Sequence, residues 1–316
     1  MILCDLYAFK KDYKNAIRHY EDLLSSYPEN YVFRYNYAIV LEKAKKYSDA
    51  EREYKKVIDY NKNFWRAYLS LGSLYLREKK IDKAEKFYKK TIEITPLNHL
   101  PYLFLANLYI EERNYDKALQ IIEKGIKRGI RNKEFYQLMG MIYSEKKQYG
   151  KAVEYFQKAI QEEDTSQIHF YLGVVYDKMG KKEKMEEEMK KAIELDSENG
   201  LALNYLGYTY LLENRNLEEA YRMIKKACTL EPDNGAFLDS LGWAYFKMGK
   251  YKLAKKYLEK AAKLEKDPEI YEHLGYLYYK LKDYMRALIW WSKSIELKKN
   301  KKIEKMIGKV KELMRK

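Results

Sequence analysis

Residues Gly235–Asp267 read GAFLDSLGWAYFKMGKYKLAKKYLEKAAKLEKD and hold a pattern that recurs along the whole 316-residue chain. With Gly235 counted as place 1, its apolar and small residues fall at places 4, 7, 8 and 11 and again at places 20, 24 and 27: Leu238, Leu241, Gly242, Tyr245, Ala254, Leu258 and Ala261. Each set has the spacing of one helix face. Between the two sets, Gly249 can leave the helical region without a steric penalty. The stretch therefore predicts two short amphipathic helices joined by a tight turn, with the small Gly242 and Ala254 where helices cross.

The same pattern occurs nine times. A small residue marks place 8 of each copy, at steps of 34, 34, 34, 34, 33, 34, 35 and 33 residues: Cys4, Ala38, Gly72, Ala106, Gly140, Gly173, Gly207, Gly242 and Gly275. Place 20 is alanine in every copy except the sixth, which has Met185, and place 11 is tyrosine in eight of the nine copies. Because each unit of such an array packs on its neighbours, the chain is predicted to be one repeat array without separate globular domains.

This pattern resembles the tetratricopeptide repeat (TPR), a 34-residue helix–turn–helix unit with small residues at places 8, 20 and 27. The last three repeats look like those of bacterial members, many of them exported or associated with the outer membrane. The resemblance implies an all-α fold: a right-handed α-solenoid superhelix of about nine TPR hairpins plus a C-terminal capping helix. We expect a TPR array over residues 1–300 and an amphipathic capping helix over residues 301–316, with repeats that start near residues 1, 31, 65, 99, 133, 166, 200, 235 and 268.

The residues just before these starts test the register, because they play no part in setting it. Seven of the eight are Asn, Thr or Asp, whose side chains accept hydrogen bonds from the free amides of a first helical turn. They are Asn30, Phe64, Asn98, Asn132, Thr165, Asn199, Asn234 and Asp267, with Phe64 the exception. The sequence therefore predicts N-caps at these seven positions.

The last helix carries one apolar stripe at helical spacing: Ile303, Met306, Ile307, Val310, Leu313 and Met314. Its other face is basic. Two interpretations stay open, a helix that caps the last repeat, as helical arrays require, and a basic amphipathic helix that lies on a membrane. The cap is favoured because the stripe continues the packing pattern of the repeats.

The formal net charge is +15, and the isoelectric point is near 9.3. Such a charge attracts nucleic acid and anionic lipid, but lysine is mixed with glutamate on nearly every outer helix face, which favours a solvated surface. A nucleic-acid-binding helical repeat and a membrane-associated assembly factor are therefore alternative functions, neither of them favoured.

The two cysteines, Cys4 and Cys228, lie six repeats apart, too far for a disulfide, and are predicted to pack as small apolar residues. No run of about 18 apolar residues predicts a transmembrane helix. The first residues, MILCDLYAFKK, do not have the pattern of a signal peptide. Localisation stays open, cytoplasmic by default and exported or periplasmic if a signal peptide is missing before Met1, which already stands at place 5 of an incomplete first repeat.

No motif for phosphate loops, HExxH zinc sites or CxxC pairs occurs. The four histidines fall in four different repeats: His19, His99, His169 and His273. No acid–base pair converges in the pattern. The sequence therefore predicts a protein that is not an enzyme and has no cofactor and no metal site.

The TPR resemblance also implies where a partner binds. If the core takes places 4, 7, 8 and 11, the adjacent stripe of each first helix is places 2, 5, 9, 12 and 13, which in this family lines a concave groove for a partner peptide or helix. We expect the partner on repeats six to nine, where the stripe and its flanks hold aromatic and acidic side chains: Phe170, Asn204, Tyr208, Asp239, Trp243, Phe246, Glu272, Tyr276 and Tyr279. Aromatic residues are favoured anchors at interfaces. The alternative is a tight superhelix in which these rings pack on one another.

The acids beside these rings, Asp239, Glu269 and Glu272, reverse the sign of the basic chain locally and suit a partner with apolar anchors and a Lys or Arg. The Trp243 ring is expected at the surface, so that Trp243→Ala would weaken binding by about 2 kcal/mol or more and leave stability nearly intact. Some TPR proteins hold a partner's C-terminal carboxylate with a set of Lys, Asn and Arg. That set is not matched here, because places 5 and 9 of the first repeat are Met1 and Asp5.

Overall fold

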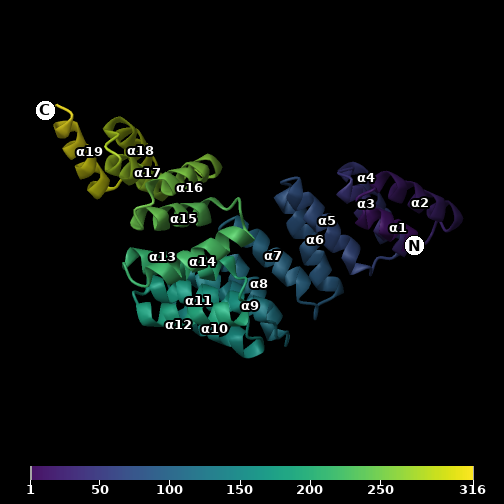
Figure 1. Cartoon of the computed structure of the whole chain (residues 1–316). Helices are drawn as coiled ribbons and strands as arrows, with labels where there is room; N and C mark the ends of the chain where they lie inside the picture. The colour runs from purple at the N-terminus through teal and green to yellow at the C-terminus, as the bar shows by residue number, and fades with distance from the viewer. Residues whose placement is uncertain (1, 316) are drawn as a thin grey trace. The chain divides into compact units, whose positions relative to one another are not determined.

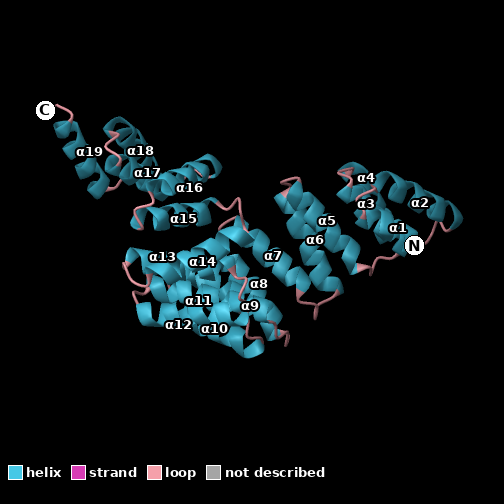
Figure 2. Cartoon of the chain, in the orientation of Figure 1, coloured by secondary structure: helices cyan, strands magenta, loops and turns pink. Residues whose placement is uncertain are grey.

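A computed structural model describes residues 2–315, with side chains from Leu6 onward. The expectations for Met1, for the Cys4 side chain and for Lys316 lie outside these described residues. Within them the chain forms nineteen helices and no strand (Figure 2). The predicted all-α fold is confirmed.

The chain divides into two compact units, Met1–Glu162 and Glu163–Lys316, here called the N-terminal and C-terminal units (Figure 1). The helices of the N-terminal unit are α1 (Ile2–Phe9), α2 (Tyr13–Ser26), α3 (Tyr31–Lys43), α4 (Tyr47–Tyr60), α5 (Trp65–Arg77), α6 (Ile81–Ile94), α7 (Leu100–Glu111), α8 (Tyr115–Lys127), α9 (Lys133–Glu145) and α10 (Tyr149–Glu162). Those of the C-terminal unit are α11 (Ser166–Lys178), α12 (Lys182–Leu195), α13 (Gly200–Leu212), α14 (Leu217–Leu230), α15 (Gly235–Lys247), α16 (Tyr251–Leu264), α17 (Pro268–Lys280), α18 (Tyr284–Leu297) and α19 (Lys301–Leu313).

Helices α1 to α18 pair into nine hairpins, each with an odd-numbered first helix and an even-numbered second helix, and successive hairpins stack within each unit. Seven first helices begin at the residue that the repeat register predicts, and α7 begins at Leu100, one residue after the predicted His99. In the C-terminal unit, α15 also contacts the first helices α13 and α17 directly. These three first helices therefore form one continuous face, on which most of the predicted binding residues lie.

The glycines at place 8 of six hairpins are required by the packing inside those hairpins. A Cβ added to Gly242 would lie 2.6 Å from Cγ of Leu258, and one added to Gly140 would lie 2.9 Å from the Phe156 ring. Both partners stand at place 24 of the second helix and are fully buried or nearly so. The small residue at the predicted helix crossing therefore makes room for the large side chain at place 24, because a close-packed interior has no space for both.

Six of the predicted caps form a side-chain hydrogen bond to a backbone amide of the following helix: Asn30, Asn98, Asn132, Asn199, Asn234 and Asp267. Thr165 is the N-cap of α11 as predicted, but its side chain makes no such bond. The N-cap of α7 is His99, one residue after the predicted Asn98. Phe64, the predicted exception, makes none either. Most first helices are thus started by the local sequence before any packing is considered.

The turn inside each hairpin has one backbone feature in common. The residue at place 15 has a positive φ of 52–74° in all nine hairpins: Lys11, Lys45, Lys79, Arg113, Lys147, Gly180, Asn214, Gly249 and Lys282. Only two of these residues are glycine, although glycine adopts this region most readily. The break between the helices is correctly predicted at Gly249, but across the repeats it does not depend on glycine.

Helix α19 packs against α18 and buries part of its apolar stripe, Ile303, Ile307 and Val310. Met306 is half-buried, and Leu313 and Met314 are exposed. The residues that would enter a membrane in the alternative interpretation are therefore mostly covered by the protein itself.

Candidate functional site

Four of the nine predicted binding residues line one cavity of the C-terminal unit: Tyr208, Trp243, Glu272 and Tyr276. The cavity has a volume of about 540 Å³. Its other lining residues come from α13, α17, α18, the segment between α18 and α19, and the start of α19: Leu212, Pro268, Glu269, His273, Ser294, Lys298, Lys299, Asn300, Lys301 and Lys302. The structure thus gathers side chains from three hairpins and from the start of α19 around one hollow.

Three more predicted residues support this cavity from outside it. Phe246 stacks on the Trp243 ring with a centroid distance of 4.6 Å, and Asp239 bonds to His273. Tyr279 packs on Trp291 at 5.8 Å. The same Trp291 ring lies 5.4 Å from the ring of Tyr276, so it connects Tyr279 to the cavity wall.

The remaining two predicted residues do not line the cavity. Phe170, on α11, packs against Tyr171 and Tyr205, with centroid distances of 5.5 and 6.1 Å. Asn204, on α13, has a buried side-chain oxygen without a hydrogen-bond partner. The predicted groove residues therefore form one central cluster on α13, α15 and α17, with Phe170 outside it.

Trp243 is not the surface ring that the sequence predicted. Its side chain lies between the rings of Phe246 and His273, with the His273 centroid only 4.0 Å away, and the residue is 9% exposed. The ring is covered because place 9 of the eighth repeat faces place 6 of the ninth, where His273 stands. Trp243 is therefore part of the packed interior and forms a wall of the cavity with the ring area that remains.

Asp239 forms a buried ion pair with His273, whose ring is part of this stack. Nδ1 of His273 lies 2.8 and 3.0 Å from the two carboxylate oxygens of Asp239, and both residues are nearly inaccessible to solvent. Burial alone would lower the pKa of His273, but the Asp239 carboxylate, together with the charges of Glu269 and Glu272, outweighs burial and raises this pKa above its ordinary value. Asp239 is thus occupied inside the protein and is not free for a partner's cation, contrary to the prediction.

The two glutamates at the cavity also have intramolecular partners. The hydroxyl of Tyr208 donates to Oε1 of Glu269 at 2.5 Å, and Nδ2 of Asn300 donates to Oε2 of Glu272 at 3.0 Å. Burial, reinforced by the Glu269 charge, raises the pKa of Tyr208, so its hydroxyl stays a donor. The acids on which the predicted partner charge depended are therefore all engaged by neighbouring side chains.

Sequence reasoning missed the lysines that line this cavity. Lys298, Lys299, Lys301 and Lys302 come from the end of α18 and the start of α19, and all four are exposed. Nζ of Lys302 lies 5.6 Å from the centroid of the Tyr276 ring. The run KKNKK is visible in the sequence, but it reads as part of a solvated basic face, and only the placement of α19 beside α17 and α18 brings it to the cavity.

Two hydrogen-bond donors on the cavity wall lack a partner. Nε1 of Trp243 and the hydroxyl of Tyr276 are buried, and neither bonds to any other described residue. An unsatisfied buried polar group costs about 1–3 kcal/mol. Both residues line the cavity, and each group would gain an acceptor if its side chain turned toward a ligand that carries carbonyl or carboxylate oxygens.

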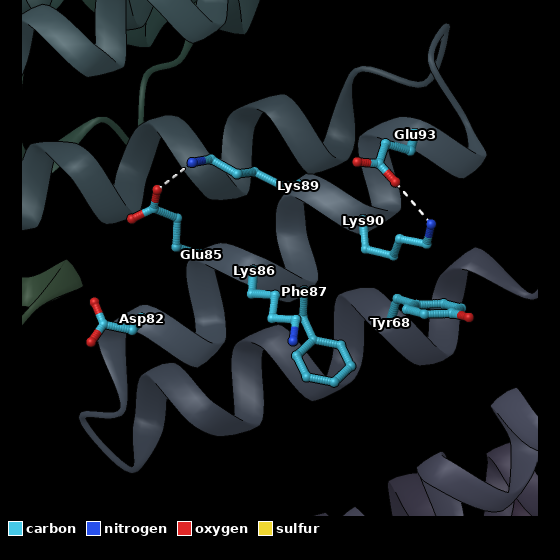
Figure 3. Close-up of a pocket in the computed structure, with 8 residues that line it drawn as sticks. All are labelled: Tyr68, Asp82, Glu85, Lys86, Phe87, Lys89, Lys90 and Glu93. Carbon is cyan, nitrogen blue, oxygen red and sulfur yellow. Dashed lines mark hydrogen bonds and ion pairs between the residues drawn. The ribbon is translucent and has the colours of Figure 1, made fainter.

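A second hollow lies in the N-terminal unit along α6 and has a volume of about 660 Å³. Figure 3 shows its lining residues: Tyr68, Asp82, Glu85, Lys86, Phe87, Lys89, Lys90 and Glu93. Lys89 pairs with Glu85 at 2.5 Å, and Lys90 pairs with Glu93 at 2.8 Å. This hollow is a furrow between solvated side chains of α6, the second helix of its hairpin. Two of its lysines are neutralised by glutamates of the same helix.

The other chemically reactive side chains lie apart from the cavity. Cys228 is buried, its thiol donates to the backbone oxygen of Phe237 at 3.1 Å, and burial raises its pKa to about 12. His169 is buried between Asp164 and Glu188. Across the described residues, no group of three or more His, Cys, Asp or Glu side chains is arranged to hold a metal ion. None of the described helices is long and apolar enough to cross a membrane.

Comparison with protein families identifies the repeat. Two models described as tetratricopeptide repeat match residues 10–74 and 75–142, and residues 133–164, 166–199 and 237–268. Together these matches cover more than half of the chain. The chain is a tetratricopeptide repeat protein. A comparison with curated protein sequences found no match.

Solved TPR structures resemble this one in fold. A tetratricopeptide repeat protein from Parabacteroides merdae ATCC 43184 is 18% identical, with a TM-score of 0.56 over 78% of this chain and 98% of its own. The APC/C hetero-tetramer Cut9-Hcn1 includes a chain that is 16% identical, with a TM-score of 0.51 over 94% of this chain and 52% of its own. At these identities the likeness shows the fold alone.

TPR arrays are protein–protein interaction modules, and this TPR protein is accordingly an interaction scaffold for a protein or peptide partner. The nucleic-acid alternative is not favoured, because many outer-face lysines are paired with glutamates one helical turn away: Glu51–Lys55, Glu85–Lys89, Glu154–Lys158 and Glu186–Lys190. The membrane alternative is not favoured, because Ile303, Ile307 and Val310 of the α19 stripe are buried within the protein and cannot contact lipid.

Proposed function

We propose that this TPR protein is a non-catalytic scaffold that holds a segment of a partner protein against α13, α15 and α17, with the 540 Å³ cavity as the anchor point. Residues 1–300 supply the array in this proposal, and α19 covers the last hairpin. The observation that carries it is the combination of aromatic walls with two buried donors that lack acceptors, Trp243 Nε1 and the Tyr276 hydroxyl.

An extended peptide offers both hydrogen-bond acceptors and apolar side chains to the cavity. Its backbone carbonyls are acceptors at regular intervals, so one of them satisfies a donor that the folded chain leaves unpaired. Its apolar side chains can bury against the rings of Tyr208 and Tyr276 and against Leu212, which is 55% exposed at the cavity. Desolvated aromatic pockets of this kind are where interface energy concentrates.

A random-peptide display selection against the full chain tests this proposal. Enriched peptides are synthesised with a fluorophore and titrated against the wild type and against Leu212→Gln, which removes an apolar wall at an exposed position. We expect Leu212→Gln to weaken binding by roughly tenfold, since burial of a leucine side chain contributes about 1.5 kcal/mol or more.

The matched control is Leu264→Gln, at the exposed end of α16, because Leu264 is 45% exposed and does not line the cavity. This variant should bind the peptides as the wild type does. Equal losses in the two variants, or the absence of any enriched peptide, would contradict the proposal.

A further inference from the structure

The charges around the cavity are unevenly satisfied. Four lysines line it, Lys298, Lys299, Lys301 and Lys302, and among the described residues none of them forms an ion pair with a carboxylate. The two glutamates on the lining already accept hydrogen bonds, from Tyr208 and from Asn300. These donors are neutral and leave the glutamate charges in place, but the four lysines outnumber the two glutamates, so the lining carries an excess of positive charge.

We infer that the cavity takes an acidic segment of the partner, one that places Asp or Glu carboxylates beside an apolar side chain. This inference rests on the proposed function and specifies its partner. It reverses the charge predicted from the sequence, because Asp239 is paired with His273 and the four lysines outnumber the two glutamates on the lining.

The lysine segment is held in place at the cavity. Asn300 donates through Nδ2 to Glu272 on α17 and accepts through Oδ1 from the backbone amide of Lys302, so it ties the start of α19 to the cavity wall. Asn300 is also the N-cap of α19, and the partial positive charge of a helix N-terminus adds to that of the lysines. The amines of Lys301 and Lys302 thus extend from a fixed backbone and not from a free loop.

The neutral groups of the wall favour the same class of ligand. The two unpartnered groups, Trp243 Nε1 and the Tyr276 hydroxyl, can both donate, and a carboxylate is an acceptor with four lone-pair positions. A lysine or arginine of a partner offers only donors and would stand among four like charges. An apolar neighbour of the carboxylate finds Leu212 at the same cavity.

A protein segment fits these features better than a nucleic acid. Glu269 and Glu272 keep their negative charges on the lining, so they repel a chain that carries a charge at every residue more than a peptide whose few carboxylates can lie at the lysines and away from the glutamates. A peptide can place its carboxylates at the lysines and apolar side chains elsewhere, whereas a phosphate backbone cannot. One peptide can therefore pack its apolar side chains on the aromatic and apolar walls while its carboxylates pair with the lysines.

The test begins with the peptides from the display selection described above. Their composition is the first readout, since enrichment of Asp and Glu supports the inference and enrichment of Lys and Arg overturns it. The tightest peptide is then synthesised in three versions, with its acidic residues kept, changed to Gln or changed to Lys. We expect the acidic version to bind the wild type about tenfold more tightly than the Gln version, and more weakly as salt rises.

The decisive variant changes Lys298, Lys299, Lys301 and Lys302 together to Gln. It should lose the preference for the acidic version while its binding of the Gln version stays within about twofold. The matched control changes Lys250, Lys252, Lys256 and Lys263 to Gln, which removes the same charge from exposed positions of the same unit that do not line the cavity. This control should keep the preference.

Failure of the inference is distinguishable from failure of the proposed function. If all three versions bind equally and Leu212→Gln weakens the binding of each, the result supports the proposed peptide binding at the cavity and contradicts the acidic specificity. The inference is also wrong if a fluorescent RNA oligonucleotide binds more tightly than the acidic peptide and is released by the 298/299/301/302 variant. If no peptide binds in any version, both proposals are wrong.

Discussion

The hollow along α6 and the cavity of the C-terminal unit are similar in volume, about 660 and 540 Å³, but their charged groups are satisfied differently. Along α6, Lys89 and Lys90 are neutralised by glutamates on the same helix. At the cavity, the glutamates bond to neutral donors, and the lysines of residues 298–302 have no carboxylate partner among the described residues. This difference in unpaired lysines, and not the volume, is the reason why we propose the cavity and not the furrow as the binding site.

The largest effect is expected at Trp243, because the cavity wall is part of the core. Trp243→Ala should lower the free energy of unfolding by about 3–5 kcal/mol, the cost of truncating a buried aromatic ring. Urea denaturation followed by circular dichroism measures this loss. Phe87→Ala, at the half-buried ring along α6, should lower the free energy of unfolding by less. A Trp243→Ala variant as stable as the wild type would show that the Trp243 ring is not part of the core.

Gly275→Ala comes next, because it disturbs the support beneath the cavity. A Cβ at this position would overlap the ring of Trp291, which is fully buried and contacts both Tyr276 and Tyr279. Overpacking of this kind should cost roughly 1–3 kcal/mol of unfolding free energy. Gly308→Ala on α19 is the control: no atom lies within 4 Å of an added Cβ there, so this variant should gain up to about 1 kcal/mol of helix stability. Equal stability of the two variants in thermal unfolding would argue against close packing at Gly275.

The ion pair below the cavity predicts a dependence of stability on pH. The pKa of His273 is raised in the folded state above its unfolded value near 6.5, so the stabilisation is fully present below about pH 6.5 and is lost as pH rises through the folded pKa. Chemical denaturation over this range should show falling stability in the wild type and a smaller decline in Asp239→Asn. The nearby Glu269 and Glu272 contribute to the His273 shift and remain in this variant. An unchanged slope would show that Asp239 does not cause it.

The smallest changes in stability are expected for single lysine substitutions, one at each hollow. Lys89→Gln removes an exposed ion pair and should change the free energy of unfolding by about 0.5 kcal/mol or less. Lys302→Gln, whose side chain has no such pair, should leave the stability unchanged and weaken only the binding of the acidic peptide. A larger stability loss at Lys302 than at Lys89, measured by thermal unfolding, would indicate that the 298–302 segment is structural.

The fold was largely predictable because each hairpin is determined by local patterns. The small residue at place 8, the alanine at place 20 and an N-cap such as Asn234 all lie within one repeat, and their spacing reports which helix face is buried. The nine hairpins, most first-helix starts and six of the seven predicted caps follow from these patterns. The break at place 15 was predicted only at Gly249. Lys79, with φ of 59°, has the same conformation, and its residue type gives no indication of it.

The cluster at the cavity could be predicted only in part. Tyr208, Trp243, Glu272 and Tyr276 were predicted from their places on the stripe of each first helix, because residues at corresponding places of successive first helices lie side by side. The prediction failed for the burial of Trp243, which depends on the ring that the next repeat places against it. It also failed for the internal bonding of the acids and for the lysines of residues 298–302, because these contacts join different repeats.

The sequence by itself determined the repeat, its two helices, their buried faces and the family. The tertiary structure alone decided that Tyr208 bonds to Glu269, 61 residues away, that Asp239 bonds to His273, and that Asn300 brings a lysine run to Glu272. The physical reason is that helix periodicity is local, whereas the rotation of one hairpin relative to the next is set by the packing of many side chains together. That rotation selects which polar groups meet, and so which charges remain available to a partner.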